Sequence, residues 1–170
     1  MRELEIVFTK SKKCFPVLSW LIRLWTWKSY SHVAKGHEVK DWGRSYFQAS
    51  GKVVNYEYHT EFNKHHKIVK KYVLQVTKEM RTQINKECFQ ESGKQYGLLQ
   101  NIGIVIVDIA GLFGKKVDNP FKKGRNCSEL IYTIVLKELK PELDYNENTI
   151  KPHQIEEIIN EHFKDILLDI

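Results

Sequence analysis

Short β-type segments dominate residues 1–76, whereas residues 77–170 carry almost only helical patterns. Five segments are rich in β-branched and aromatic residues, namely residues 4–8, 29–34, 45–49, 53–58 and 68–76. Gly43 and Ser50-Gly51 mark turns between them. Strands that are followed in the chain by helices are typical of α+β domains with an antiparallel sheet. The order of the segments therefore predicts an α+β fold in which an antiparallel sheet packs against helices.

One helical pattern interrupts the β-type segments, and four more fill the second half. The first covers residues 15–27, and the others cover residues 78–92, 96–113, 127–139 and 149–168. Thr77 and Gly93 are residue types that often begin and end a helix. The segment at residues 15–27 is apolar on two opposite sides and contains Trp20, Trp25 and Trp27. Such a helix is either buried all round or contacts a partner or a membrane surface.

The length of 170 residues suits one domain with a single core, so we expect residues 1–170 to form one domain. The longest apolar stretch, residues 98–113, contains Asp108 and glycines and falls short of the roughly 20 apolar residues that span a bilayer. The first residues lack the apolar core of a Sec signal peptide. We therefore expect no transmembrane segment, and a cytoplasmic or virion-associated protein.

The formal net charge of +6 would favour a polyanionic partner, but the lysines are scattered along the chain. Without a basic stripe we expect no specific nucleic-acid binding. The three cysteines, Cys14, Cys88 and Cys127, cannot all pair within the chain, and their spacing matches no zinc motif. We expect reduced thiols, no metal and no cofactor.

Cys127 lies where a loop enters a helix, and Arg125 precedes it by two residues. The positive end of the helix dipole and a nearby guanidinium would both lower the pKa of a thiol. A cysteine that only fills the core would more naturally lie in the middle of a helix, as Cys88 does. From its position alone, Cys127 is either a reactive nucleophile or core filler.

A cysteine nucleophile needs a base, and the chain offers seven histidines. His32 lies within a β-type segment, so it is either a base or a hydrogen-bonded core histidine. The remaining six lie in polar or lysine-rich surroundings or on the last helix, and we interpret them as surface residues: His37, His59, His65, His66, His153 and His162.

The two candidate residues occur in the patterns Tyr30-Ser31-His32-Val33-Ala34 and Asn126-Cys127-Ser128-Glu129-Leu130-Ile131. In this order, these patterns resemble the two signatures of the circularly permuted papain-like amidases, relatives of the NlpC-type cell-wall peptidases. The resemblance spans nearly the whole chain. The chain is also compact, and in this it is similar to the short members of the group that bacteriophages encode. It implies a circularly permuted papain-like fold.

The resemblance implies that Cys127 is the nucleophile, that His32 is the base and that Gln48 orients His32. Many relatives have Glu at the third position, and a neutral Gln would stabilise an imidazolium less than a carboxylate does. The alternative interpretation is that Gln48 is an ordinary strand residue without a role in catalysis. Tyr96 and Ser31 are expected to line the substrate or oxyanion pocket, although packing alone would also explain Tyr96.

We therefore expect a cysteine hydrolase that cleaves an amide bond through an acyl-enzyme, with a peptide, isopeptide or peptidoglycan-like substrate. Two alternatives stay open. The first is a weakly active or inactive relative that serves as a structural or interaction protein among virion partners. The second is a lipid-directed acyltransferase at a membrane surface, which the three tryptophans of residues 15–27 would suit.

Overall fold

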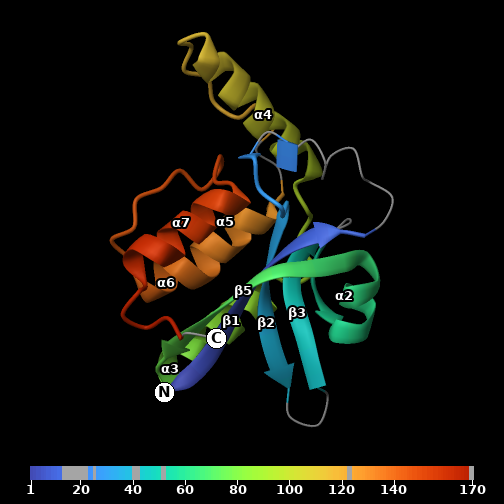
Figure 1. Ribbon diagram of the computed structural model, residues 1–170, viewed down its shortest axis with the longest axis vertical. Helices are drawn as coiled ribbons and strands as arrows, with labels where there is room; N and C mark the ends of the chain where they lie inside the picture. The colour runs from blue at the N-terminus through green and yellow to red at the C-terminus, as the bar shows by residue number, and fades with distance from the viewer. Residues whose placement is uncertain (13–22, 25, 40–42, 51–52, 122–123, 169–170) are drawn as a thin grey trace.

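Every pair of neighbouring strands in the central sheet is antiparallel (Figure 1). The computed structural model describes residues 1–12, 23–24, 26–39, 43–50, 53–121 and 124–168. Its strands run in the order β4-β3-β2-β1-β5 and comprise β1 (Arg2–Ser11), β2 (His32–Val39), β3 (Gly43–Ser50), β4 (Val53–Tyr58) and β5 (His66–Val76). The predicted α+β class and antiparallel sheet are confirmed.

The central strand β1 is buried without interruption from Leu4 to Thr9 because both faces of the sheet are covered. Ile6 and Phe8 belong to the main core, which also contains the helices after β5. Val7 belongs to a smaller core on the opposite face, together with Phe62 of the short helix α2 (His59–His65). A strand buried on both faces reads as a nearly continuous apolar run, which is why residues 4–8 stood out in the sequence.

The second half of the chain supplies the helices α3 (Lys78–Glu91), α4 (Leu98–Leu112), α5 (Cys127–Ile131), η1 (Tyr132–Leu136), α6 (Lys137–Leu139) and α7 (Pro152–His162). The π-helical turn η1 joins α5 to α6, so the three form the single helix predicted at residues 127–139. Helices α5, α6 and α7 lie together against the sheet, whereas α4 extends away from the rest of the molecule (Figure 1).

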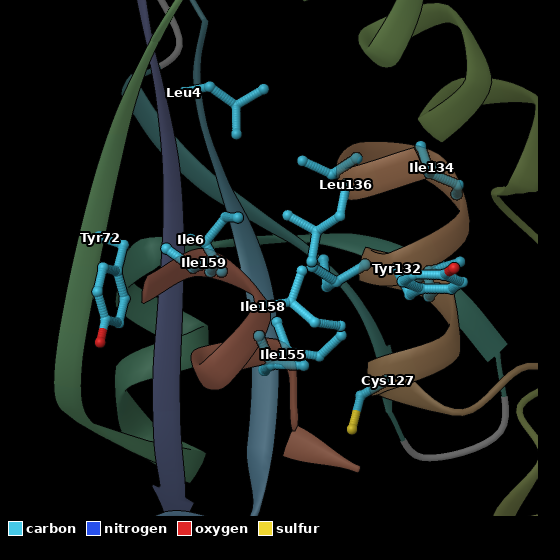
Figure 2. Close-up of a cluster of buried hydrophobic side chains, with 14 of the residues drawn as sticks. Leu4, Ile6, Tyr72, Cys127, Tyr132, Ile134, Leu136, Ile155, Ile158 and Ile159 are labelled. Carbon is cyan, nitrogen blue, oxygen red and sulfur yellow. The ribbon is translucent and has the colours of Figure 1, made fainter. Parts of the chain in front are cut away.

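Helix α7 packs beside the helix that begins at Cys127, and that helix itself contacts β2 and β3. Ile155, Ile158 and Ile159 of α7 point toward Ile6 of β1 and Leu136 of η1, as Figure 2 shows. These side chains are at most 1% exposed, so this packing fixes the position of α5 relative to the sheet. Cys127 lies at one end of this cluster.

The structure differs from the sequence predictions at several boundaries. Strand β2 begins at His32 rather than at residue 29, and α2 was not predicted at all. Helix α7 ends at His162 rather than near residue 168. The helix predicted at residues 15–27 lies mostly outside the described residues, although residues 23, 24 and 26 are helical.

Both outer strands of the sheet receive backbone partners. On β4, Val54 donates its N–H to Lys94 at 2.8 Å and accepts from Gly93 at 2.8 Å. On β5, Gln75 donates to Ile166 at 2.7 Å, and Val73 accepts from Leu168 at 2.9 Å. Residues 166–168 pair with β5 in this way, and the chain therefore leaves the helical conformation after α7.

Candidate active site

The fold brings Cys127 and His32 together from distant parts of the sequence. His32 is the first residue of β2, and Cys127 is the first residue of α5, with its sulfur turned toward the strands (Figure 2). The Asn126 side chain caps α5 by accepting the N–H of Glu129 at 2.8 Å. The start of the helix is therefore fixed at the residue before the thiol.

The surroundings of the Cys127 thiol favour its thiolate form. Burial by itself raises the pKa of this thiol, which is 4% exposed. The positive charge of His32 and its hydrogen bond to the sulfur outweigh burial, with further hydrogen bonds from the Val33 backbone and Ser128. The pKa of Cys127 consequently lies below that of an ordinary cysteine.

The same pairing acts in the opposite direction on His32. Burial lowers the pKa of its imidazole, but the charge of the Cys127 thiolate and the hydrogen bond with it raise the pKa above the usual value. Hydrogen bonding to Gln48 and the charge of Glu57 add to the rise. The two buried groups thus stabilise each other as a thiolate and an imidazolium.

Gln48 contacts one nitrogen of the His32 ring. Nε2 of His32 lies 2.8 Å from Oε1 of Gln48, and Nε2 of Gln48 donates to a carboxylate oxygen of Glu57 at 2.5 Å. Because a carboxylate can only accept, the amide NH₂ faces Glu57 and the amide oxygen faces the imidazole. The imidazole Nε2 therefore carries a hydrogen, which leaves Nδ1 as the ring nitrogen available to the thiol.

Glu57 is a member of this hydrogen-bonded chain that the sequence reasoning missed. It lies on β4, next to β3, where Gln48 pairs with Asn55. Residues two apart on a strand share a face, so Glu57 lies diagonally across from Gln48. Burial raises the pKa of the Glu57 carboxyl, while His65 and the hydrogen bond from Gln48 oppose the rise. The Glu57 carboxylate therefore lies behind Gln48, separated from the imidazole by the Gln48 amide.

The prediction that His66 is a surface residue is wrong. His66 is 9% exposed, and its ring stacks on that of His32 with centroids 4.9 Å apart. Phe62 of α2 stacks on its other side at 4.6 Å. Burial and the nearby charge of His32 lower the pKa of His66 to about 3, so it stays neutral beside the imidazolium. The lysine-rich sequence around His66 indicates a surface position, whereas its burial depends on packing against α2, which the sequence did not predict.

Arg125, which the sequence places two residues before the thiol, forms ion pairs with two carboxylates. Its guanidinium pairs with Glu129 at 2.6 Å and with Glu91 at 3.6 Å. His32 supplies the main positive charge that lowers the pKa of Cys127. Arg125 and Gln100 hold the two oxygens of the Glu129 carboxylate and so stabilise the first turn of α5.

Tyr96 and Ser31 lie close to the pair in different ways. The Tyr96 hydroxyl accepts from Asn101 at 2.9 Å, and burial together with the Cys127 thiolate raises its pKa. Tyr96 is thus close enough to the sulfur for the thiolate charge to shift the pKa of its hydroxyl. Ser31 is buried directly before His32, and its backbone N–H donates to Thr9 at 3.0 Å.

Other expectations concern cysteines, metals and membranes. Cys88 is fully buried in α3, and burial raises its pKa to about 11; Cys14 lies outside the described residues. Within the described part of the chain, no cluster of three or more His, Cys, Asp or Glu side chains could hold a metal ion. In the same residues, no helix combines the length and hydrophobicity needed to cross a bilayer.

Comparison with models of known protein families gave no match, and comparison with curated proteins gave none either.

Proposed function

We propose that the protein is a cysteine hydrolase of the circularly permuted papain-like, NlpC-related group, which cleaves an amide bond by acyl transfer. One observation carries the proposal. The Cys127 thiol, the His32 imidazole, the Gln48 amide and the Glu57 carboxylate form one hydrogen-bonded chain that favours the thiolate. A fold needs no such chain around a cysteine that only fills the core.

In the proposed reaction the Cys127 thiolate attacks the carbonyl carbon, forming a carbon–sulfur bond, while the carbonyl electrons move to the oxygen. The N–H groups in the first turn of α5 would stabilise this oxyanion. When the carbon–nitrogen bond breaks, the imidazolium gives its Nδ1 proton to the leaving amine. Neutral His32 then takes a proton from water, whose oxygen attacks the thioester and releases the acid and the thiolate.

Gln48 and Glu57 would keep the ring of His32 in the orientation that this reaction needs. A neutral amide can do so by accepting the Nε2 hydrogen, as Gln48 does. The charge of Glu57, transmitted at longer range, would supply part of the imidazolium stabilisation that an adjacent carboxylate gives in relatives. We propose peptides, isopeptides or peptidoglycan-like amides as the substrate class, by resemblance to the NlpC-related group.

The test uses p-nitrophenyl acetate, an activated ester that reports a nucleophilic thiolate without knowledge of the natural substrate. We expect a burst of p-nitrophenol and one acetyl group on the peptide that contains Cys127. Cys127→Ser and His32→Ala should abolish the burst, while Cys88→Ser should keep it. Acetylation spread equally over the cysteines would contradict the proposal. Purified peptidoglycan, with products analysed by mass spectrometry, then tests the substrate class.

The second candidate function is that of an inactive relative with a structural role, for instance among virion partners. The observation that favours it is the closure of the site, since Cys127 is 4% and His32 is 9% exposed. A substrate could reach the sulfur only if side chains around it moved. A thiolate that reacts with iodoacetamide, but with neither the ester nor peptidoglycan, would favour this role.

A further inference from the structure

Helix α4 carries a continuous apolar stripe on the surface of the molecule. Apolar side chains recur there at steps of three and four, which places them on one side of a helix. All of them, and the residues that continue the stripe past the end of α4, are more than a third exposed: Leu99, Ile102, Ile106, Ile109, Leu112, Phe113 and Val117. Single exposed apolar residues are ordinary, but a contiguous group of this kind marks an interaction surface.

The opposite side of α4 contacts the rest of the protein. Ile104 is buried, and Gln100 donates to Glu129 at 2.7 Å. Asp108 is the sole charged residue between positions 98 and 112 in the sequence, and it pairs with Lys151 at 2.7 Å. The exposed stripe of α4 therefore carries no charged side chain.

Positive charge begins where α4 ends. Residues 111–118 are all exposed, and they include Lys115 and Lys116, which follow Phe113 after Gly114, as well as Asp118. Thr26 lines a small depression with Ile104 and Asp108, on the side of α4 that faces the rest of the protein. The exposed surface thus combines an apolar stripe and a pair of lysines.

A second copy of the chain is one candidate for covering this stripe. Helices that pair in water flank their apolar seam with charged residues, which set the register and orientation of the partners. The positions that flank the stripe of α4 include Gly103, Val105 and Ala110, none of which is charged. Parallel pairing would also bring two copies of Lys115 and Lys116 together.

The chemistry fits an anionic lipid bilayer better. An amphipathic segment binds in the interfacial region by burying apolar side chains among the acyl chains, while lysines contact anionic headgroups. We propose that the exposed stripe of α4, with its tip at residues 112–117, docks the protein on the surface of an anionic membrane.

The start of α4 lies next to the candidate active site. Asn101, in the first turn of α4, donates to Tyr96, whose pKa the Cys127 thiolate raises. The docking itself goes beyond the proposed hydrolase function and does not depend on it, so Cys127→Ser should bind vesicles like the unmodified protein.

The test is sedimentation of the full chain with large unilamellar vesicles made of phosphatidylcholine with or without phosphatidylglycerol. We expect binding to the anionic vesicles that weakens with salt, and at least about tenfold weaker binding to the neutral ones. Replacing Leu112 and Phe113 together by Ser should remove binding. Phe89→Ser is the matched control, because Phe89 is 76% exposed on α3, far from the stripe in the sequence.

A charge-reversed variant, Lys115→Glu with Lys116→Glu, should lose the preference for phosphatidylglycerol while it keeps the unfolding midpoint of the parent. These residues are exposed, so the folding of the variant is not in question. Absence of vesicle binding by the unmodified protein would overturn the proposal. So would a concentration-dependent dimer, measured by sedimentation velocity, that the change of Leu112 and Phe113 abolishes without any effect on vesicle binding.

Discussion

The amide oxygen of Gln48 lies 2.8 Å from Nε2 of His32, and the amide nitrogen of Gln48 contacts Glu57. Gln48 therefore does two things at once: it fixes the orientation of the imidazole ring, and it separates a carboxylate from that ring by one amide group. The reactivity of Cys127 is the property through which this arrangement can be measured.

Cys127 should react with iodoacetamide at pH 7 at least about a hundredfold faster than Cys88. His32 lowers the pKa of Cys127, whereas burial raises that of Cys88 to about 11, and only the thiolate reacts. The two rates are measured separately by mass spectrometry of the peptides that contain each residue. His32→Ala should slow Cys127 toward the rate of Cys88. Equal rates in the unmodified protein would show that Cys127 is not activated.

Gln48→Leu should slow the alkylation of Cys127 by at least about tenfold, equivalent to about 1.4 kcal/mol. Leucine keeps the bulk of the side chain but cannot accept the Nε2 hydrogen, so the ring of His32 loses its fixed orientation. The control is Ser45→Ala on the same strand, which removes only a hydrogen bond to the His37 carbonyl. If the alkylation rate of Cys127 depended on pH in the same way in Gln48→Leu and in the control, Gln48 would not be the orienting residue.

Gln48→Glu should destabilise the protein by about 1–3 kcal/mol, because it places a second carboxylate beside Glu57. Exchange of the two residues, Gln48→Glu with Glu57→Gln, should restore stability to within about 1 kcal/mol and place the carboxylate next to His32. Urea unfolding of the two single variants and the double variant gives the coupling free energy. Additive effects of the two substitutions would mean that the side chains do not interact.

His66 should make the protein less stable as the pH falls from 6.5 toward 3. Its pKa is about 3 in the folded protein and near 6.5 in the unfolded chain, so the unfolded chain binds more protons in this range. The free energy of unfolding should drop by up to about 1.4 kcal/mol per pH unit from this residue alone. His66→Phe should therefore show a shallower loss between pH 7 and pH 4.5 in urea unfolding. If the free energy of unfolding fell equally with pH in both proteins, the lowered pKa of His66 would be contradicted.

Asn126→Ala should cost about 1 kcal/mol of stability through loss of the cap at the start of α5. Asn126→Asp keeps the acceptor and should keep the stability, but its negative charge one residue from Cys127 should raise the pKa of the thiol. Thermal unfolding and alkylation rates measured on the same two variants separate these effects. An Ala variant as stable as the unmodified protein would show that the cap does not depend on the side-chain oxygen.

The sequence predicted the sheet well because its strands are buried and bounded by turn residues, as in Val53–Tyr58, which has the predicted limits. It also predicted which residues meet Cys127, through the resemblance of two short motifs. Glu57 could have been found from the register of the β3–β4 hairpin, in which Ser50 pairs with Val53 and Gln48 with Asn55. His66 could not, since its burial depends on Phe62 in a seven-residue helix without a clear sequence pattern.

The pairing of residues 166–168 with β5 has a consequence for this edge of the sheet. An outer strand with unpaired N–H and C=O groups is a template on which another chain can add a strand. Gln75 and Val73 would offer such a template if the chain were cut after Phe163, since Ile166 and Leu168 supply their present partners. Residues 166–168 thus protect this edge of the sheet from pairing with another chain.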